Sequence, residues 1–124
     1  MASDNDHKRA KDVDKHTKSW GHEEWIVNNE LYCGKKLVFK KAGGATSLHF
    51  HIKKHETMYC AKGRFKITSV DSKTGVPRDF HLDPGDSIVI VPLDIHRITA
   101  LDDHSELIEF STHHEDSDSY RAAK

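Results

Sequence analysis

The sequence predicts an all-β fold, a sandwich or closed barrel of eight or nine short strands. From Trp20 onward, short apolar or alternating segments are separated by turn-forming residues, as in chains built of many strands. The segments recur about ten residues apart, a spacing typical of sandwiches and barrels. No helical stripe of useful length occurs before residue 113.

The individual strands follow from these segments in chain order. We expect strands at residues 24–28, 36–40, 47–53, 57–61, 64–70, 78–82, 87–91, 96–101 and 106–111. The breaks between them, such as AGGA, DSKTG and DPGD, carry the Gly, Pro and Asp that tight turns need.

The chain divides into an arm and one domain. Residues 1–18 are almost wholly polar and cannot bury enough surface to offset their ordering entropy, so we expect a flexible N-terminal arm. Residues 19–124 are expected to form a single domain, because a chain that is 35% hydrophobic supports one modest core.

Composition also limits the classes of binding partner that we expect. A formal net charge of −1, with 31% charged residues, gives no basic field of the kind that nucleic-acid binding requires. No apolar run approaches the roughly 20 residues that span a bilayer, and the N-terminus lacks a signal-peptide segment. Cys33 and Cys60 form no CxxC pair, which is typical of plain thiols in a reducing compartment. We expect a soluble cytoplasmic protein with a small-molecule substrate.

A candidate metal site lies in residues 43–63, GGATSLHFHIKKHETMYCAKG. His49 and His51 share one face of a strand, Glu56 can reach the same space from the next strand, and His96 begins a later strand. Three imidazoles and a carboxylate suit borderline first-row metals and leave positions open for substrate. The alternative is that a chain with 11 histidines places two of them on a solvated strand face by chance.

The opposite face of the same strand is apolar. If the histidines point into a barrel, Leu48, Phe50 and Ile52 point outward and must be covered by another strand or another subunit. A homodimer is the expectation.

These spacings resemble a known family. Gly43, His49, His51, Glu56 and Gly63 match the first motif of the cupin superfamily at every position. The stretch from Gly85 through Pro92 to His96 resembles the second motif, with Asp94 where that family usually has glycine and without the usual asparagine after the histidine.

The resemblance implies a double-stranded β-helix, or jelly-roll barrel, that binds one divalent transition metal ion, which is Mn, Fe, Co, Ni or Zn. The ligands it implies are His49, His51, Glu56 and His96. His55 is the rival for the third position, and the spacing to Gly63 favours Glu56.

A narrower resemblance covers most of residues 18–121. The segments KSWGHEEW, TSLHFHIKKHETMYCAKG, VPLDIHR and LIEFSTHHEDSDSYR are similar to the cupin domain of type II mannose-6-phosphate isomerases and to small sugar-isomerase-like cupins. This implies a metal-dependent isomerase or epimerase acting on a sugar or sugar phosphate. The alternatives are a non-catalytic sugar-binding or regulatory cupin and an iron-dependent dioxygenase.

Aldose–ketose isomerisation needs a base besides the metal. Glu109 on the last strand is the candidate base, with Lys53 or His81 as proton relays. The alternatives are a solvated strand residue for Glu109 and an edge-protecting charge for Lys53 or Lys54.

Three further groups have two interpretations each. Trp20 and Trp25 stack on a sugar at the barrel entrance or pack the first strand onto the core. Residues 113–121 cap the barrel, with Asp116 or Asp118 pairing with Arg121 or another barrel residue, or they form a second metal site. Five basic residues form a phosphate site or belong to the ordinary surface, and they are Lys53, Lys54, Lys62, Arg64 and Arg97.

Overall fold

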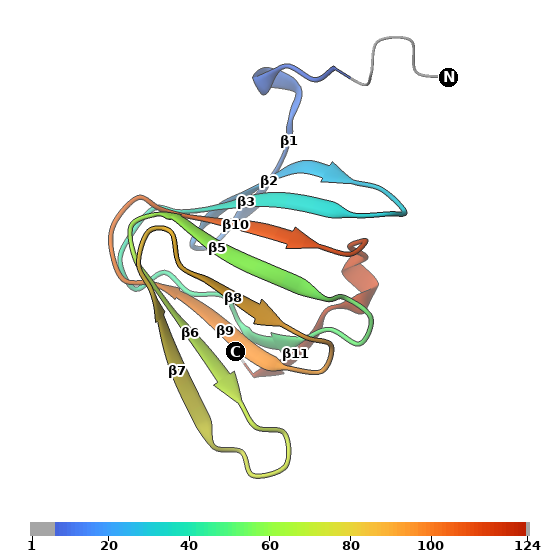
Figure 1. The fold of residues 1–124 in the computed structure, drawn as a ribbon. Coiled ribbons are helices and arrows are strands. Elements are labelled where there is room, and N and C mark those ends of the chain that lie inside the picture. The colour runs from blue at the N-terminus through green and yellow to red at the C-terminus, as the bar shows by residue number, and fades with distance from the viewer. Residues whose placement is uncertain (1–6, 124) are drawn as a thin grey trace.

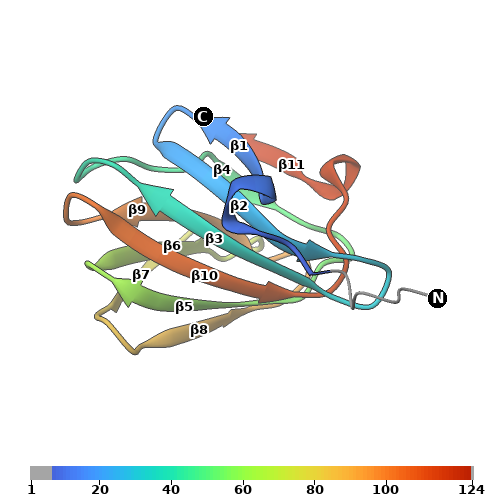
Figure 2. The same ribbon diagram turned by 90° about the horizontal axis from the view of Figure 1, so that it is seen from above.

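The computed structural model describes residues 7–123, which form two antiparallel sheets that face each other (Figure 1). The six-stranded sheet consists, in spatial order, of β1 (Asp14–Lys18), β2 (Gly21–Asn28), β3 (Cys33–Phe39), β10 (Ser105–Ser111), β5 (Glu56–Lys62) and β8 (Ser87–Ile90). The five-stranded sheet consists of β11 (Tyr120–Ala123), β4 (Leu48–Phe50), β9 (Ile95–Ala100), β6 (Phe65–Val70) and β7 (Pro77–Leu82). Figure 2, seen from above, shows the larger sheet in this order.

All nine expected strands are present. One of them is much shorter than predicted, because β4 ends at Phe50 where the sequence pattern runs to residue 53. The backbone amides of residues 52–54 instead donate to the carboxylate of Asp118, so they leave the sheet. Apart from β1 and β11, the described residues add only two short 3-10 helices, η1 (Ala10–Asp12) and η2 (Asp116–Asp118).

Part of the expected N-terminal arm is a strand. Asp14–Lys18 pairs residue by residue with β2, and the His16 ring stacks on Trp25 with centroids 4.0 Å apart. The prediction considered only apolar burial, but an edge strand satisfies its backbone by pairing while its side chains stay largely exposed. Residues 1–6 of the expected arm lie outside the described residues.

The space between the sheets is divided into an apolar half and a charged half. At one end Trp20 stacks on Phe39 at 4.1 Å, and Phe65, Ile67 and Leu107 complete the core. Along the same strands the inward positions then change character. The inward-facing residues at the other end are charged, and they are Lys35 on β3, Glu56 on β5 and Glu109 on β10. The fold therefore places a polar interior beside the core.

Two tight turns use the left-handed region of the backbone. Gly63 has φ 73°, and a Cβ there would lie 2.1 Å from Oγ of Ser105, so this motif position accepts only glycine. In the second motif Gly85 has φ 96°, and the left-handed residue between Pro92 and His96 is Leu93, with φ 75°. Leu93 donates its amide to the carbonyl of His51 at 2.7 Å, which fixes this turn against the first motif. No helix in residues 7–123 has the length and apolarity to cross a membrane.

Candidate metal centre

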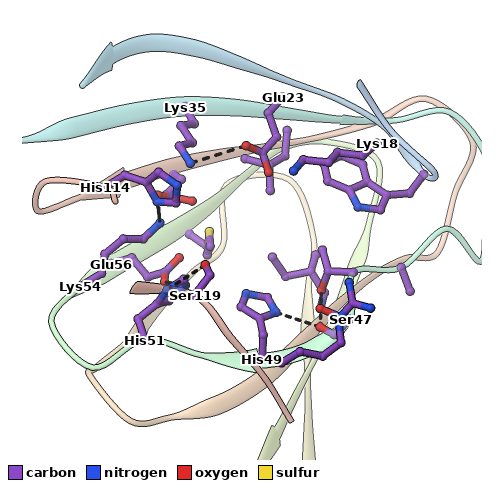
Figure 3. A pocket seen from close by; sticks show the side chains of 18 of the residues that line it. Lys18, Glu23, Lys35, Ser47, His49, His51, Lys54, Glu56, His114 and Ser119 are labelled. Atoms are coloured by element: carbon purple, nitrogen blue, oxygen red, sulfur yellow. Dashed lines mark hydrogen bonds and ion pairs between the residues drawn. The ribbon is translucent and has the colours of Figure 1, made fainter. Parts of the chain in front are cut away.

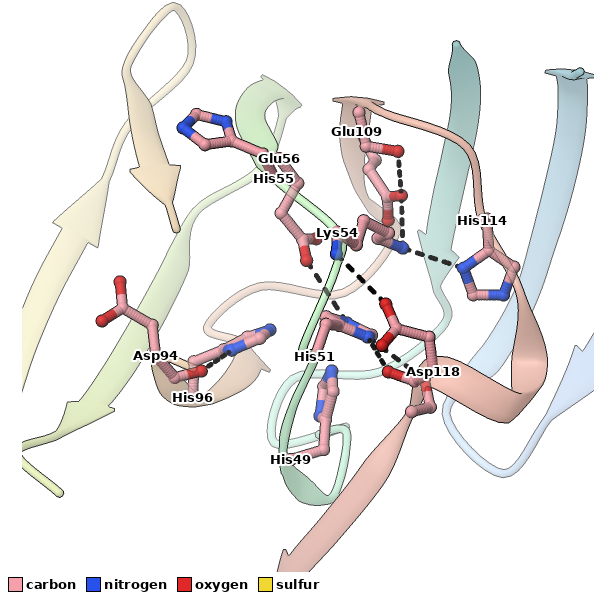
Figure 4. Close-up of polar contacts among 12 residues, drawn as sticks. His49, His51, Lys54, His55, Glu56, Asp94, His96, Glu109, His114 and Asp118 are labelled. Carbon is pink, nitrogen blue, oxygen red and sulfur yellow. Dashed lines mark hydrogen bonds and ion pairs between the residues drawn. The ribbon is translucent and has the colours of Figure 1, made fainter. Parts of the chain in front are cut away.

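Three histidines, one on β4, one just after it and one on the neighbouring β9, converge inside the barrel. His49 on β4 pairs directly with His96 on β9, and His51 follows two residues after His49. One ring nitrogen from each of His49, His51 and His96, hereafter the histidine cluster, lies within 4.8 Å of the other two. The rings of His49 and His96 are 4.3 Å apart between centroids (Figure 4). This spacing suits three ligands on one ion.

Backbone carbonyls fix the orientation of all three rings. Each Nδ1 lies 2.8 to 2.9 Å from a carbonyl oxygen, and the three carbonyls belong to Ser47, Asp118 and Asp94. Because a carbonyl only accepts, each Nδ1 carries the proton and each Nε2 presents a lone pair. Nε2 of His96 is buried and has no hydrogen-bond partner in the described chain. Three fixed lone pairs facing one point fit a divalent ion.

Burial also keeps the cluster neutral. Desolvation lowers the pKa of each of the three imidazoles to about 4. The rings are therefore neutral at pH 7, with Nε2 unprotonated, and can ligate without releasing a proton.

Glu56, the fourth ligand that the sequence pattern predicts, lies beside the histidine cluster. Its carboxylate is buried, and Oε2 lies 3.3 Å from Nε2 of His51 with no hydrogen-bond partner. Burial, followed by the nearby Glu109 carboxylate, raises the pKa of Glu56 to about 8. Two acceptor atoms in contact need a cation or a proton between them, so Glu56 fits the fourth ligand position. His55 is exposed and points away from the cluster (Figure 4).

The segment that carries His51 is held by η2. The Asp118 carboxylate accepts the amides of Ile52, Lys53 and Lys54 at 3.0 to 3.2 Å. The carbonyl of the same residue accepts Nδ1 of His51. Residues 113–121 therefore act as a capping segment, with backbone amides rather than Arg121 as the partner of Asp118. No group of potential metal ligands is found in this segment of the described chain.

The histidine cluster opens onto a cavity of about 550 Å³ between the sheets (Figure 3). Glu109 faces this cavity and forms an ion pair of 2.8 Å with Lys54, whose amine is also 3.0 Å from Nδ1 of His114. Burial acts to raise the pKa of Glu109, but Lys54 and then Lys35 outweigh it and lower this pKa to about 2. Glu109 is thus a buried, ionised carboxylate.

The other two candidate catalytic residues do not reach the cavity. The Lys53 side chain is 71% exposed and lies 3.5 Å from Glu115 on the outside of the barrel. His81 is exposed on β7, the edge strand of the smaller sheet, and is paired with Lys66. The chain leaves the sheet after Phe50, and in the segment that follows Lys54 is buried whereas Lys53 is exposed.

The expected basic residues are also distributed differently. Of the five named for anion binding, Lys54 alone lines the cavity, whereas Arg64 pairs with Asp102 at the surface and Arg97 donates to the carbonyl of Thr46. The basic side chains that do line it are Lys18, Lys35, Lys54 and Arg121. The sequence could have identified Lys35, since its spacing of two from Cys33 and from Leu37 places it on the same buried face of β3.

The tryptophans have packing roles. Trp20 belongs to the core cluster and lines the cavity from its apolar end. Trp25 donates to Glu23 at 2.9 Å, and the Lys35 amine lies 4.3 Å from the centre of its ring. Trp25 therefore orients the Lys35–Glu23 pair, whose charged atoms are 3.5 Å apart.

Comparison with solved structures confirms the fold. CapF from Staphylococcus aureus, a capsular polysaccharide assembling protein, matches with a TM-score of 0.79 and 16% identity over 94% of this chain and 37% of its own. Oxalate decarboxylase from Bacillus subtilis matches with a TM-score of 0.78 and 19% identity over 97% of this chain and 34% of its own. KdgF from Halomonas sp. matches with a TM-score of 0.71 and 19% identity over 88% of this chain and 94% of its own.

The chain thus spans about a third of the length of CapF and of oxalate decarboxylase. No curated protein matches its sequence. The family model described as Cupin matches residues 3–124. Together with the two facing sheets and the motif residues of the histidine cluster, this match shows that the chain belongs to the cupin family.

Proposed function

We propose that the protein is a metal-dependent enzyme that isomerises or epimerises a small sugar or sugar phosphate. The observation that carries this proposal is the histidine cluster, with its three oriented Nε2 atoms and Glu56, at the floor of a cavity that also holds an ionised carboxylate. A cavity of about 550 Å³ has room for a monosaccharide or a sugar phosphate. A relation to carbohydrate is supported by the fold shared with CapF, named for capsular polysaccharide assembly.

A divalent ion on these four ligands would polarise a substrate carbonyl and so acidify the neighbouring C–H bond. Glu109 faces the cavity as a carboxylate; it accepts the proton released from that carbon and returns it to the neighbouring carbon in an isomerisation, or to the opposite face of the same carbon in an epimerisation. Lys54 hydrogen-bonds the oxygen on which negative charge develops, and its existing contact with Glu109 places donor and acceptor side by side. His114 orients the Lys54 amine from the side away from the cluster.

Solvent exchange tests this chemistry directly. The metal content of the protein is measured first, and the metal-loaded protein is then incubated in D₂O with a panel of pentoses and hexoses, with and without phosphate. We expect deuterium at the carbon next to the carbonyl, followed by the isomeric sugar, and no exchange with Glu109→Gln. Retention of metal with no exchange on any sugar contradicts the proposal. Oxygen consumption that depends on added iron would instead indicate a dioxygenase.

A non-catalytic sugar-binding cupin is the second candidate. It is favoured by the low pKa of Glu109, since a carboxylate held near pKa 2 by Lys54 is a weak base. In that case sugars bind with measurable affinity, but no deuterium is incorporated in the D₂O assay.

We also propose a homodimer, formed by a different surface from the one that the sequence suggested. Tyr120 of the neighbouring strand β11 stacks on Phe50 at 5.3 Å and partly covers it, whereas Ile52 stays half exposed. The exposed apolar side chains that support a dimer lie on the larger sheet, where Tyr59, Val89 and Phe110 occupy neighbouring strands. Light scattering on the purified protein tests this: a dimer should become monomeric with Phe110→Lys.

A cytoplasmic location is proposed as well. Cys33 and Cys60 are both buried, unpaired thiols, which suits a reducing compartment.

A further inference from the structure

The walls of the cavity carry an excess of positive charge. Four basic side chains line it, which are Lys18, Lys35, Lys54 and Arg121. Three carboxylates line it, which are Glu23, Glu56 and Glu109. A divalent ion on the histidine cluster would add to the excess. A cavity of this size with net positive walls favours an anionic ligand over a neutral one.

Two of the four cations are already neutralised within the protein. Lys35 and Lys54 are buried and paired with Glu23 and Glu109, at 3.5 and 2.8 Å. Within residues 7–123, the side chains of Lys18 and Arg121 make neither a hydrogen bond nor an ion pair, and both are exposed where they line the cavity. The paired lysines set the field inside the cavity, whereas the unpaired cations are free to contact a ligand.

The two free cations stand on opposite walls. Arg121 on β11 is the cross-strand partner of His49, so its side chain leaves the sheet on the same face as a metal ligand. Lys18 ends β1 on the other sheet, and in Figure 3 it lies on the side of Glu23, across the cavity from His49. A ligand in the cavity would therefore be flanked by a guanidinium and an ammonium while its other end reaches the cluster.

We infer that Arg121 and Lys18 bind the anionic group of the substrate, and that the substrate class is a monosaccharide carrying a carboxylate or a phosphate. This inference rests on the proposed function for the sugar part of the ligand. Arg121 supplies the forked donors that match two oxygens of an oxyacid, and Lys18 adds a mobile charge from the opposite wall. The sequence alone favoured other basic residues, because it did not reveal that β1 and β11 border the cavity.

Three hexoses that share one ring separate the possibilities. D-Glucose, D-glucuronate and D-glucose 6-phosphate differ only at C6, and each is titrated calorimetrically into the metal-loaded protein. We expect one of the two anions to bind at least tenfold more tightly than glucose, and the tighter one identifies the carboxylate or the phosphate. Arg121→Gln and Lys18→Gln should each weaken that anion about tenfold and leave glucose unchanged.

Matched controls are Lys15→Gln on the same strand as Lys18 and Arg78→Gln on the edge strand β7, neither of which lines the cavity. Both should bind all three sugars as the wild type does. Equal affinity for the three sugars, no binding of any of them, or an equal loss for glucose and the anions in Arg121→Gln would overturn the inference. Because binding is measured without turnover, a protein that prefers the anion but fails the D₂O assay overturns the isomerase and leaves the anion site standing.

Discussion

Asp118 offers the sharpest test of how the metal centre is built. Its carboxylate accepts three consecutive amides, from Ile52, Lys53 and Lys54, and these residues follow directly after His51. Asp118→Ala removes all three acceptor contacts but keeps the backbone carbonyl that binds Nδ1 of His51. The segment 52–54 should then loosen while the fold remains.

The magnitude follows from the burial of the amides. Ile52 and Lys53 are exposed, so water replaces the lost acceptor and each bond costs about 0.5 to 1.5 kcal/mol. Lys54 is buried, so its orphaned amide costs about 1 to 3 kcal/mol. Allowing for overlap, the free energy of unfolding of the metal-free protein should fall by about 3 kcal/mol. Metal affinity should fall about 10- to 100-fold, as for other losses behind a ligating histidine.

Urea unfolding and chelator competition measure the two effects. Asp116→Ala is the matched control, because Asp116 lies in the same 3-10 helix, is 86% exposed, and within residues 7–123 its carboxylate hydrogen-bonds His114 alone. It should change the free energy of unfolding by less than about 0.5 kcal/mol. If Asp118→Ala is as stable as Asp116→Ala and binds metal equally well, the hydrogen bonds of the Asp118 carboxylate do not hold the metal centre and this reasoning is refuted.

Three further predictions concern charge and backbone. Lys54→Met leaves the Glu109 carboxylate buried without its partner, so we expect the free energy of unfolding, measured with urea, to fall by about 3 to 5 kcal/mol. Most of this loss should be recovered in the double variant Lys54→Met/Glu109→Leu. A small loss in Lys54→Met alone contradicts the pairing. Leu93 has φ 75°, so Leu93→Gly should be more stable than Leu93→Ala by about 1 kcal/mol, the reverse of the usual order. The pKa of each cluster imidazole is about 4 when folded and 6.5 otherwise, so between pH 6.5 and 4 the unfolded chain binds protons that the folded chain does not. The metal-free protein should therefore lose stability as pH falls through this window, because the three imidazoles outweigh the single proton that folded Glu56, with a pKa of about 8, holds there. Above pH 6.5 Glu56 alone acts, so stability should fall again as pH rises toward 8. A flat profile from pH 7 to 4 contradicts the buried, neutral cluster.

The sequence predicted the elements whose signals are local. Alternation and turn residues identified nine strands, and a short spacing placed His49, His51 and Glu56 together. The two-residue side-chain period of a strand puts His49 and His51 on one face, and Glu56 is the first residue of the next strand, close to them in the chain. These features need only a few neighbouring residues and no knowledge of the whole barrel.

Other features depend on contacts between distant segments. β1 and β11 are polar edge strands, so no apolar pattern marks them, and their pairing is visible only in the assembled sheets. Asp118 acts on residues 52–54 from the far end of the chain. The sequence leaves an edge charge open for Lys54, because it cannot show that the chain leaves the sheet after Phe50 and turns this side chain inward.

The central claim is that one divalent ion binds to the histidine cluster and Glu56, and metal stoichiometry tests it most directly. Elemental analysis of protein purified without added metal, with His51→Ala, His96→Ala and the control His55→Ala, compares ligands with an exposed neighbour. The account predicts one equivalent of a transition metal in the wild type and in His55→Ala, and none in folded His51→Ala or His96→Ala. One tightly bound equivalent in both of those variants would contradict it.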